Sequence, residues 1–248
     1  MKFICPSCGV KEEVIADRSP RCLKCRTPML GAMAGYTGLW MSPSFVIHRM
    51  AKIVETYGLP EATSNRRFQQ EREAWSTAVW ALGQAEVTGR HQWVEIETQN
   101  QTPDTRVHFL DQSTGDNVIN TTSVEVVDWE EHVADLMEII GNKCKKAYPA
   151  HFMLLICGRS GKTINANETA AEIGQLKVPF AEVWLIGYAD DSKMKVHVAR
   201  LYPELGHNSF DLPSVVLKWE KQMAFGKPLQ RGRGTELHQL GDSYLPIP

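Results

Sequence analysis

Apolar side chains recur with a helical period in the first third of the chain and with a period of two further on. The spacing predicts a helix over 45–57 and a longer helix over about 64–86, with Ser64 as its N-cap. The stripe that would pack this longer helix on a core consists of Trp75, Val79 and Leu82. The segment that precedes the strands is therefore expected to be helical.

Beyond that helix the pattern alternates between strands and helices. Turn-rich segments separate three stretches with a period of two, 93–98, 105–110 and 123–129. The remaining predicted elements are a helix at 130–147, a strand at 151–158, a helix at 166–176, strands at 181–189 and 196–202, and a helix near 213–222. A meander followed by strand-helix alternation predicts an α/β fold with a mixed central sheet flanked by helices.

The chain of 248 residues is long enough for one good-sized core and a small module. We divide it into a cysteine module at 1–30, a linker with an amphipathic helix at 31–60, and an α/β domain with a C-terminal tail at 61–248. No apolar run approaches the roughly 20 residues of a membrane-spanning helix, and the N-terminus carries no secretory signal. We therefore expect a cytoplasmic protein with no membrane partner.

Four of the six cysteines form two CxxC pairs, Cys5 with Cys8 and Cys22 with Cys25. Two such pairs in a chain without an export signal indicate a metal site before disulfides. Zinc prefers four tetrahedral ligands, and its binding would supply the stability that so short a module lacks. A redox dithiol and an iron site are the alternatives. Residues 2–29 closely resemble the zinc-ribbon family, although Arg26 stands where a glycine commonly follows the last cysteine.

The net charge of −2 does not indicate a nucleic-acid-binding protein. Any site for nucleic acid must therefore be a local basic patch. The cysteine module carries six basic and three acidic residues, and the tail at 218–234 carries five basic residues against one acidic. Both segments weakly favour a polyanion. A protein-contact or structural role for the module, and a solvated surface for the tail, explain the same charges.

Two carboxylates mark the predicted hairpin. Asp104 follows Pro103 at the start of one strand, and Glu125 stands among valines in the next. An ionised carboxylate in so apolar a strand is costly to desolvate unless a basic side chain or a metal pairs with it. If the strands pair, the carboxylates meet at one end of the sheet, where a hard cation such as Mg²⁺ could bind. Asp104 could instead be a turn residue, and Glu125 could bridge to Arg106.

This arrangement, Pro103-Asp104, a turn, then Glu125-Val126-Val127 within this order of elements, resembles the PD-(D/E)xK nuclease superfamily, which has the restriction-endonuclease-like fold. The resemblance covers about residues 64–158. It implies that Asp104 and Glu125 bind Mg²⁺ or Mn²⁺ and that a lysine two residues after the glutamate positions the attacking water. Here Val127 occupies the lysine position, which departs from the family pattern.

In some members of that superfamily the lysine comes from the following helix, and a further glutamate comes from the helix before the sheet. The candidate lysines near the end of the predicted helix are Lys143, Lys145 and Lys146, with Lys143 the first choice. These lysines would otherwise cap the helix C-terminus. Glu73 or Glu71 could supply the glutamate. The catalytic set that the resemblance implies is Asp104, Glu125, Lys143 and Glu73.

The sequence therefore predicts a metal-dependent nuclease, a DNA endonuclease rather than an RNA enzyme, whose zinc ribbon assists nucleic-acid or partner binding. Because Val127 replaces the lysine, a catalytically inactive adaptor that binds nucleic acid or protein is the alternative. A regulatory ribbon protein with a small-ligand domain is a third hypothesis. Enzymes of this fold often dimerise, so a homodimer or a protein partner is a further expectation.

Three other signals carry little weight. The segment 157–163, CGRSGKT, follows a predicted strand but lacks the first glycine of a phosphate-binding loop. His108 and His151 lie in predicted strands and are expected to be packed rather than to bind metal. Cys144 and Cys157 have no histidine at a recognisable spacing and are expected to be core residues.

Overall fold

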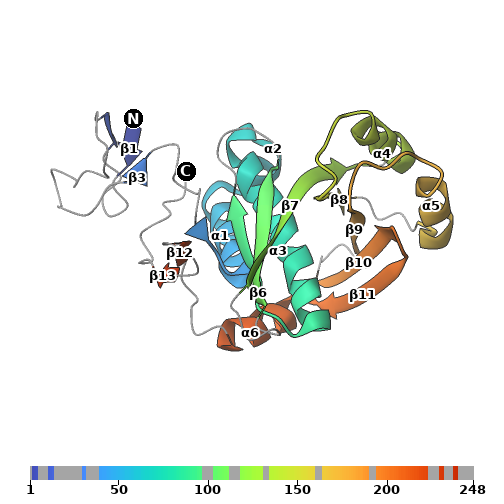
Figure 1. The fold of residues 1–248 in the computed structure, drawn as a ribbon. Coiled ribbons are helices and arrows are strands. Elements are labelled where there is room, and N and C mark those ends of the chain that lie inside the picture. The colour runs from blue at the N-terminus through green and yellow to red at the C-terminus, as the bar shows by residue number, and fades with distance from the viewer. Residues whose placement is uncertain are drawn as a thin grey trace.

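The computed structural model describes residues 39–96, 103–111, 118–130, 134–159, 164–189 and 194–222, together with short strands at 2–4, 11–13, 30–31, 229–231 and 237–239. Its helices and strands form an α/β fold, as the sequence predicted (Figure 1). β1 (Lys2–Ile4) pairs antiparallel with β2 (Lys11–Glu13) and β3 (Leu30–Gly31). Cys5, Cys8, Cys22 and Cys25 lie outside the described residues, so the zinc site stays a prediction.

A seven-stranded mixed sheet forms the centre of the structure, with the strand order β11-β10-β9-β8-β7-β6-β5. Its strands are β5 (Trp93–Ile96), β6 (Thr105–Asp111), β7 (Val118–Trp129), β8 (Phe152–Gly158), β9 (Glu182–Tyr188), β10 (Lys195–Tyr202) and β11 (Gly206–Asp211). β7, β8 and β9 run parallel, whereas the outer strands pair antiparallel. The sheet thus joins a meander to strand-helix-strand crossovers, which is the mixed arrangement expected from the pattern.

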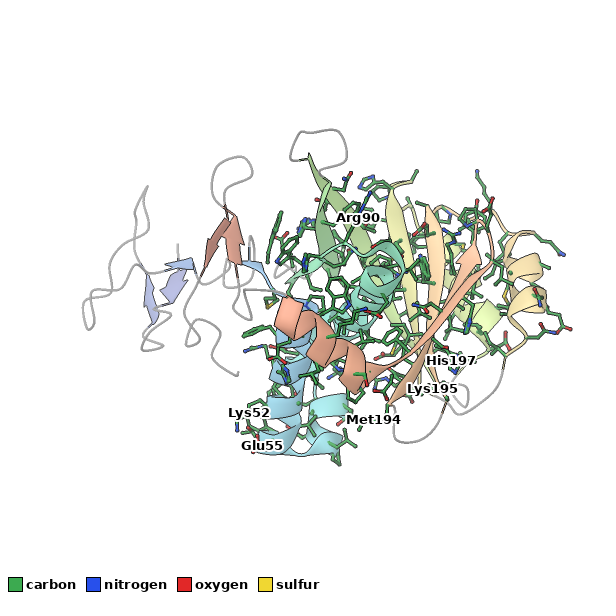
Figure 2. The ribbon with its side chains drawn as sticks, turned by 90° about the horizontal axis from the view of Figure 1, so that it is seen from below. Lys52, Glu55, Arg90, Met194, Lys195 and His197 are labelled. Carbon is green, nitrogen blue, oxygen red and sulfur yellow. The ribbon has the colours of Figure 1, made fainter. Side chains whose placement is uncertain are left out.

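Helices cover both faces of this sheet. One layer holds α1 (Pro43–Tyr57), α3 (Gln69–Thr88) and α6 (Leu212–Gln222), which share a core with Val124 and Val126 of β7. Figure 2 shows α6 lying across α1 in this layer. The other layer holds α4 (Leu136–Cys144) and α5 (Ala166–Ile173), packed on a second core. Because side chains alternate along a strand, Glu125 faces away from the first layer and toward the second.

The helix predicted over 64–86 is broken near its start. α2 (Leu59–Ser64) comes first, followed by a 3₁₀ turn, η1 (Arg66–Phe68), and then α3. Ser64 as an N-cap was wrong, because its hydroxyl ends α2 by donating to the carbonyl of Pro60 at 2.7 Å. The break lets Phe68 turn inward and pack with Ile53 of α1, a tertiary contact that the periodicity cannot report.

Other boundaries also shifted. α4 begins only at Leu136, where the Asp135 carboxylate accepts the backbone N–H of Met137 at 2.8 Å and caps the helix. β11 was not predicted, since only Phe210 among its residues is buried and the strand lacks an apolar alternation. At the N-terminal side, β4 (Leu39–Trp40) pairs with β12 (Leu229–Arg231), which pairs with β13 (Leu237–Gln239).

The histidines and cysteines that were expected to be packed differ in how far they are buried. His108 is buried, with its imidazole between Glu95 and Thr121, so that prediction is confirmed. His151 is exposed, because β8 begins only after it. Cys157 is buried in the sheet, and Cys144 is partly buried against the second core. Among the helices that the structure describes, none is long and apolar enough to cross a membrane.

Candidate active site

Asp104 lies at the open edge of β7. The ladder between β6 and β7 ends at the pair Thr105–Val124, and β7 then continues to Trp129. The Asp104 N–H donates to the carbonyl of Val124 at 3.0 Å, and its Oδ2 accepts the N–H of Val126 at 2.8 Å. The carboxylate thus replaces the missing strand partner, which fixes its position beside Glu125.

Glu125 pairs with a lysine through one oxygen only. Its Oε1 accepts hydrogen bonds from the ammonium of Lys143 at 2.6 Å and from the hydroxyl of Tyr148 at 2.9 Å. These contacts rule out the bridge to Arg106. Its Oε2 is buried and has no hydrogen-bond partner in the described part of the chain. An unsatisfied buried carboxylate oxygen is unfavourable in isolation, so this atom is suited to an added ligand.

α3 brings another carboxylate, that of Glu73, close to Asp104. The hydroxyls of Thr77 on α3 and Thr105 on β6 are hydrogen-bonded at 2.8 Å in the core. Glu73 precedes Thr77 by one helical turn, and Asp104 directly precedes Thr105, so this bond sets the two acids side by side. Glu71, the other candidate, lies elsewhere, because its carboxylate accepts from the buried Arg49 at 3.2 Å.

The three acids disturb one another electrostatically. Burial, and then the neighbouring Glu125, raise the pKa of Asp104 to about 6. Burial, and then Asp104, raise the pKa of Glu73 to about 7, although Gln69 donates to its carboxylate at 2.8 Å. For Asp104 and Glu73 the charged form is therefore less favourable near neutral pH than it is for a free side chain. A cation placed between the carboxylates would lower both pKa values and relieve the repulsion.

Lys143 supplies the basic group that Val127 lacks. α4 packs on the second core through the buried Ile140, and Lys143, almost one turn later, reaches back to Glu125. Lys145 is directed differently, since its ammonium donates to Asn142 at 3.0 Å. The favourable charge of Lys146 also reaches Asp104. The structure thus bonds Lys143 to Glu125 and couples Asp104 electrostatically to Glu125 and Glu73.

The donor set at this point fits a hard divalent ion. Carboxylate oxygens are the ligands that Mg²⁺ and Mn²⁺ prefer, and Asp104 with Glu125 offers two such groups beside the open oxygen. Within the described ranges, no group of three or more histidine, cysteine, aspartate or glutamate residues is arranged as a metal cluster. Mg²⁺ usually keeps several waters and takes only one or two protein carboxylates, so two ligands are sufficient.

Sequence reasoning missed Tyr148. It follows α4 and packs against Phe180 with ring centroids 4.7 Å apart, which aims its hydroxyl at Glu125. Burial and the adjacent Glu125 carboxylate raise the pKa of this phenol. A tyrosine before a proline carries no local signal for this role, because the contact depends on how α4 and the segment before β9 pack together.

We expect Tyr148→Phe to destabilise the fold by about 1–2 kcal/mol at pH 8, because it removes a hydrogen bond to a buried carboxylate. Urea unfolding measures the change. Tyr202→Phe is the matched control, since it removes a hydroxyl from a half-buried tyrosine and should change stability by less than about 0.5 kcal/mol. Equal effects of the two substitutions would contradict the assigned hydrogen bond.

No family model, no curated protein and no solved structure matches this chain. The class of protein must therefore be argued from the site itself.

Proposed function

We propose that this protein is a metal-dependent nuclease that hydrolyses DNA phosphodiester bonds. The observation that carries the proposal is the convergence of Asp104 and Glu125 at a strand edge, with the Lys143 ammonium on the same glutamate. Two carboxylates with one lysine at this position are the residues that such chemistry requires. The PD-(D/E)xK resemblance, with the lysine contributed by α4 in place of Val127, supports the same assignment.

Each side chain would have a distinct role. Asp104 and Glu125 would hold Mg²⁺ or Mn²⁺, which when bound lowers the pKa of an attacking water and offsets charge on the phosphodiester. Lys143 stands where its ammonium can orient that water or stabilise developing negative charge. Glu73, with its pKa of about 7, is placed to accept a proton or to add a ligand. Tyr148 holds Glu125 in position.

The nucleic acid would be held by basic segments outside the site. We propose that Cys5, Cys8, Cys22 and Cys25 bind structural zinc and that the basic residues around them contact the substrate or a protein partner. Among the five basic residues of 218–234, Lys218 pairs with Glu86, and the other four would follow the phosphate backbone. DNA is proposed over RNA as substrate, and a homodimer would place two such sites on one duplex.

The direct test incubates the purified 248-residue chain with plasmid DNA, linear DNA or RNA in Mg²⁺, Mn²⁺ or EDTA. We expect cleavage of DNA in either metal and none in EDTA. Mg²⁺ should also raise the melting temperature, because it relieves the repulsion among the carboxylates. Cleavage that persists in the Asp104→Ala variant would remove the assignment.

A catalytically inactive adaptor with the same fold remains the second candidate. Val127 at the usual lysine position favours it, and so does the Lys143 ammonium, which already neutralises Glu125. This hypothesis predicts salt-dependent DNA binding, or a stable protein complex, with no cleavage in any metal. Binding without cleavage, unchanged in Asp104→Ala, would favour it over the nuclease.

A further inference from the structure

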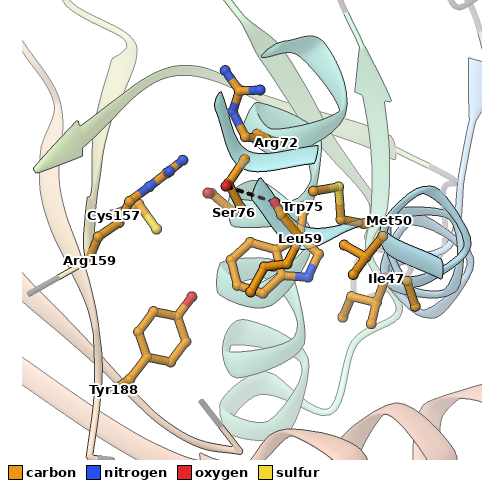
Figure 3. A pocket seen from close by; sticks show the side chains of 12 residues that line it. Ile47, Met50, Leu59, Arg72, Trp75, Ser76, Cys157, Arg159 and Tyr188 are labelled. Atoms are coloured by element: carbon orange, nitrogen blue, oxygen red, sulfur yellow. Dashed lines mark hydrogen bonds between the residues drawn. The ribbon is translucent and has the colours of Figure 1, made fainter. Parts of the chain in front are cut away.

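A cavity of about 330 Å³ lies against α3 and is lined by Arg72, which directly precedes Glu73. Its walls come from α1, α2 and α3 on one side and from the ends of β8 and β9 on the other. Figure 3 shows Met50, Leu59 and Trp75 on one side of the space, facing Arg159 and Tyr188, with Arg72 at one end. The volume falls in the range of small-molecule sites, which begins near 300 Å³.

The interior of this cavity suits a flat aromatic group. The rings of Trp75 and Tyr188 face each other and are nearly parallel, with centroids 6.1 Å apart and an interplanar angle of 25°. Met50 and Leu59 lie on the Trp75 side, while Cys157 and Ser76 add a thiol and a hydroxyl. A planar heterocycle can stack on one of these rings and still find polar partners.

Two guanidinium groups border the cavity. Arg72 donates to the carbonyls of Asn65 at 2.8 Å and Ala62 at 3.3 Å, yet its Nε is buried and has no hydrogen-bond partner among the described residues. Arg159 is held by Asp128 at 2.6 Å. Burial, and then the charge of Arg159, lower the pKa of Arg72, so the two cations repel each other. An anion between them would relieve the repulsion and could use the free Nε.

The same residues join the cavity to the carboxylate site. Arg72 directly precedes Glu73 on α3, and Asp128 lies on β7 three residues beyond Glu125. The charge of Asp128 is felt by both Arg72 and Glu73, so the two sites share one electrostatic network. A chain of alternating phosphates and bases could therefore occupy both sites at once.

We infer that this cavity receives one nucleobase of the substrate strand, next to the phosphodiester that is cut, while Arg72 and Arg159 hold the phosphate of that nucleotide. The inference rests on the proposed function. The shared chemistry is a nucleoside phosphate, and the electrostatic link between Arg72 and Glu73 favours a nucleotide within a strand over a free one. The base must leave its stack to enter, so single-stranded or unpaired positions are preferred.

The test uses the 248-residue chain in EDTA and short oligonucleotides that carry one 2-aminopurine at successive positions. We expect one position at which fluorescence changes on binding. Ala51→Trp, which fills the cavity from α1, should abolish this change and weaken binding about tenfold. Ala171→Trp, an equal substitution at an exposed position of α5, should do neither. Equal behaviour of the two variants would overturn the inference.

A second variant tests the same inference in case Ala51→Trp fails to fold. Arg159→Gln leaves the apolar walls intact and removes one cation. It should lower the slope of log affinity against log salt concentration by about one unit, the contribution of one phosphate contact. An unchanged slope would count against the phosphate contact. If free deoxynucleotide monophosphates bound as tightly as the oligonucleotides, the assignment to a strand would be wrong. Because binding is measured without metal, a protein that binds in this way but never cleaves would refute the nuclease and not the cavity.

Discussion

Asp104→Asn is expected to reduce metal-dependent DNA cleavage about a thousandfold or more, while it stabilises the metal-free protein at pH 8. The loss follows because Asp104 is one of two carboxylates that would hold the cation, and removing several kcal/mol of charge stabilisation costs a factor of ten for each 1.4 kcal/mol or so. Asparagine keeps an oxygen that can accept the N–H of Val126, so the local structure is retained.

The expected gain in stability follows from the raised pKa of Asp104. The pKa of Asp104 is about 6 in the folded protein, against 3.8 for the free side chain. The folded state therefore binds this proton more tightly than the unfolded state, and stability is lost as pH rises from about 4 to about 6. Asparagine cannot ionise, so the variant escapes this loss. We expect a gain of about 3 kcal/mol at pH 8 and almost none at pH 4.

Urea unfolding in EDTA at both pH values measures this difference. Asp211→Asn is the control, because the Ser214 side chain and backbone lower the pKa of that exposed carboxyl, and its removal should destabilise at pH 8. Saturating Mg²⁺ should stabilise only proteins with Asp104 intact. An Asp104→Asn protein that is no more stable than wild type at pH 8 would show that burial and the neighbouring Glu125 do not raise the pKa of Asp104 as described.

The acids of the site could be predicted because they depend on local pattern. The alternation of valines placed Glu125 in a strand, and the turn before it placed Asp104 opposite. Lys143 was chosen from the resemblance to the PD-(D/E)xK superfamily, some members of which take the lysine from the following helix. For the two acids, short-range periodicity together with a single strand pairing was enough to place them on neighbouring strands.

The choice between Glu71 and Glu73 could not be made from the sequence. Glu71 and Glu73 are two positions apart on a helix, so their side chains point about 200° apart. The rotation of α3 on the sheet therefore decides which of the two reaches Asp104. That rotation is fixed by the buried Thr77–Thr105 hydrogen bond and by Arg49 of α1, which takes Glu71. These are contacts between distant segments.

The cavity was missed for a similar reason. Its walls come from segments more than a hundred residues apart, such as Met50 and Tyr188, and each residue alone resembles an ordinary core or surface position. The break between α2 and α3 also contributes, since it presents the two carbonyls that hold Arg72. A continuous helix over 64–86, as the periodicity predicted, would not have shown this feature.

Lys143→Met is expected to reduce cleavage about a hundredfold or more, because it removes the only cation that bonds to Glu125 within the described residues. Lys145→Met, at the residue that caps the C-terminus of this helix, removes an exposed ammonium bonded to Asn142 and should change the rate by less than about twofold. Initial rates on linear DNA at saturating Mg²⁺ measure both. Equal rates for the two variants would exclude a catalytic role for Lys143.

A double variant tests whether a lysine on β7 can replace Lys143. Val127 is two residues beyond Glu125 on β7, so its side chain leaves the same face of the sheet, and it is only partly buried. A lysine there can extend its stem along the apolar surface and bring its ammonium to the carboxylates. We therefore expect Val127→Lys to recover at least about tenfold of the activity lost in Lys143→Met. Recovery would show that α4 and β7 are alternative sources of one charge at one point. A double variant as inactive as Lys143→Met, with its fold intact by circular dichroism, would mean that the helix itself, and not only the ammonium, is required.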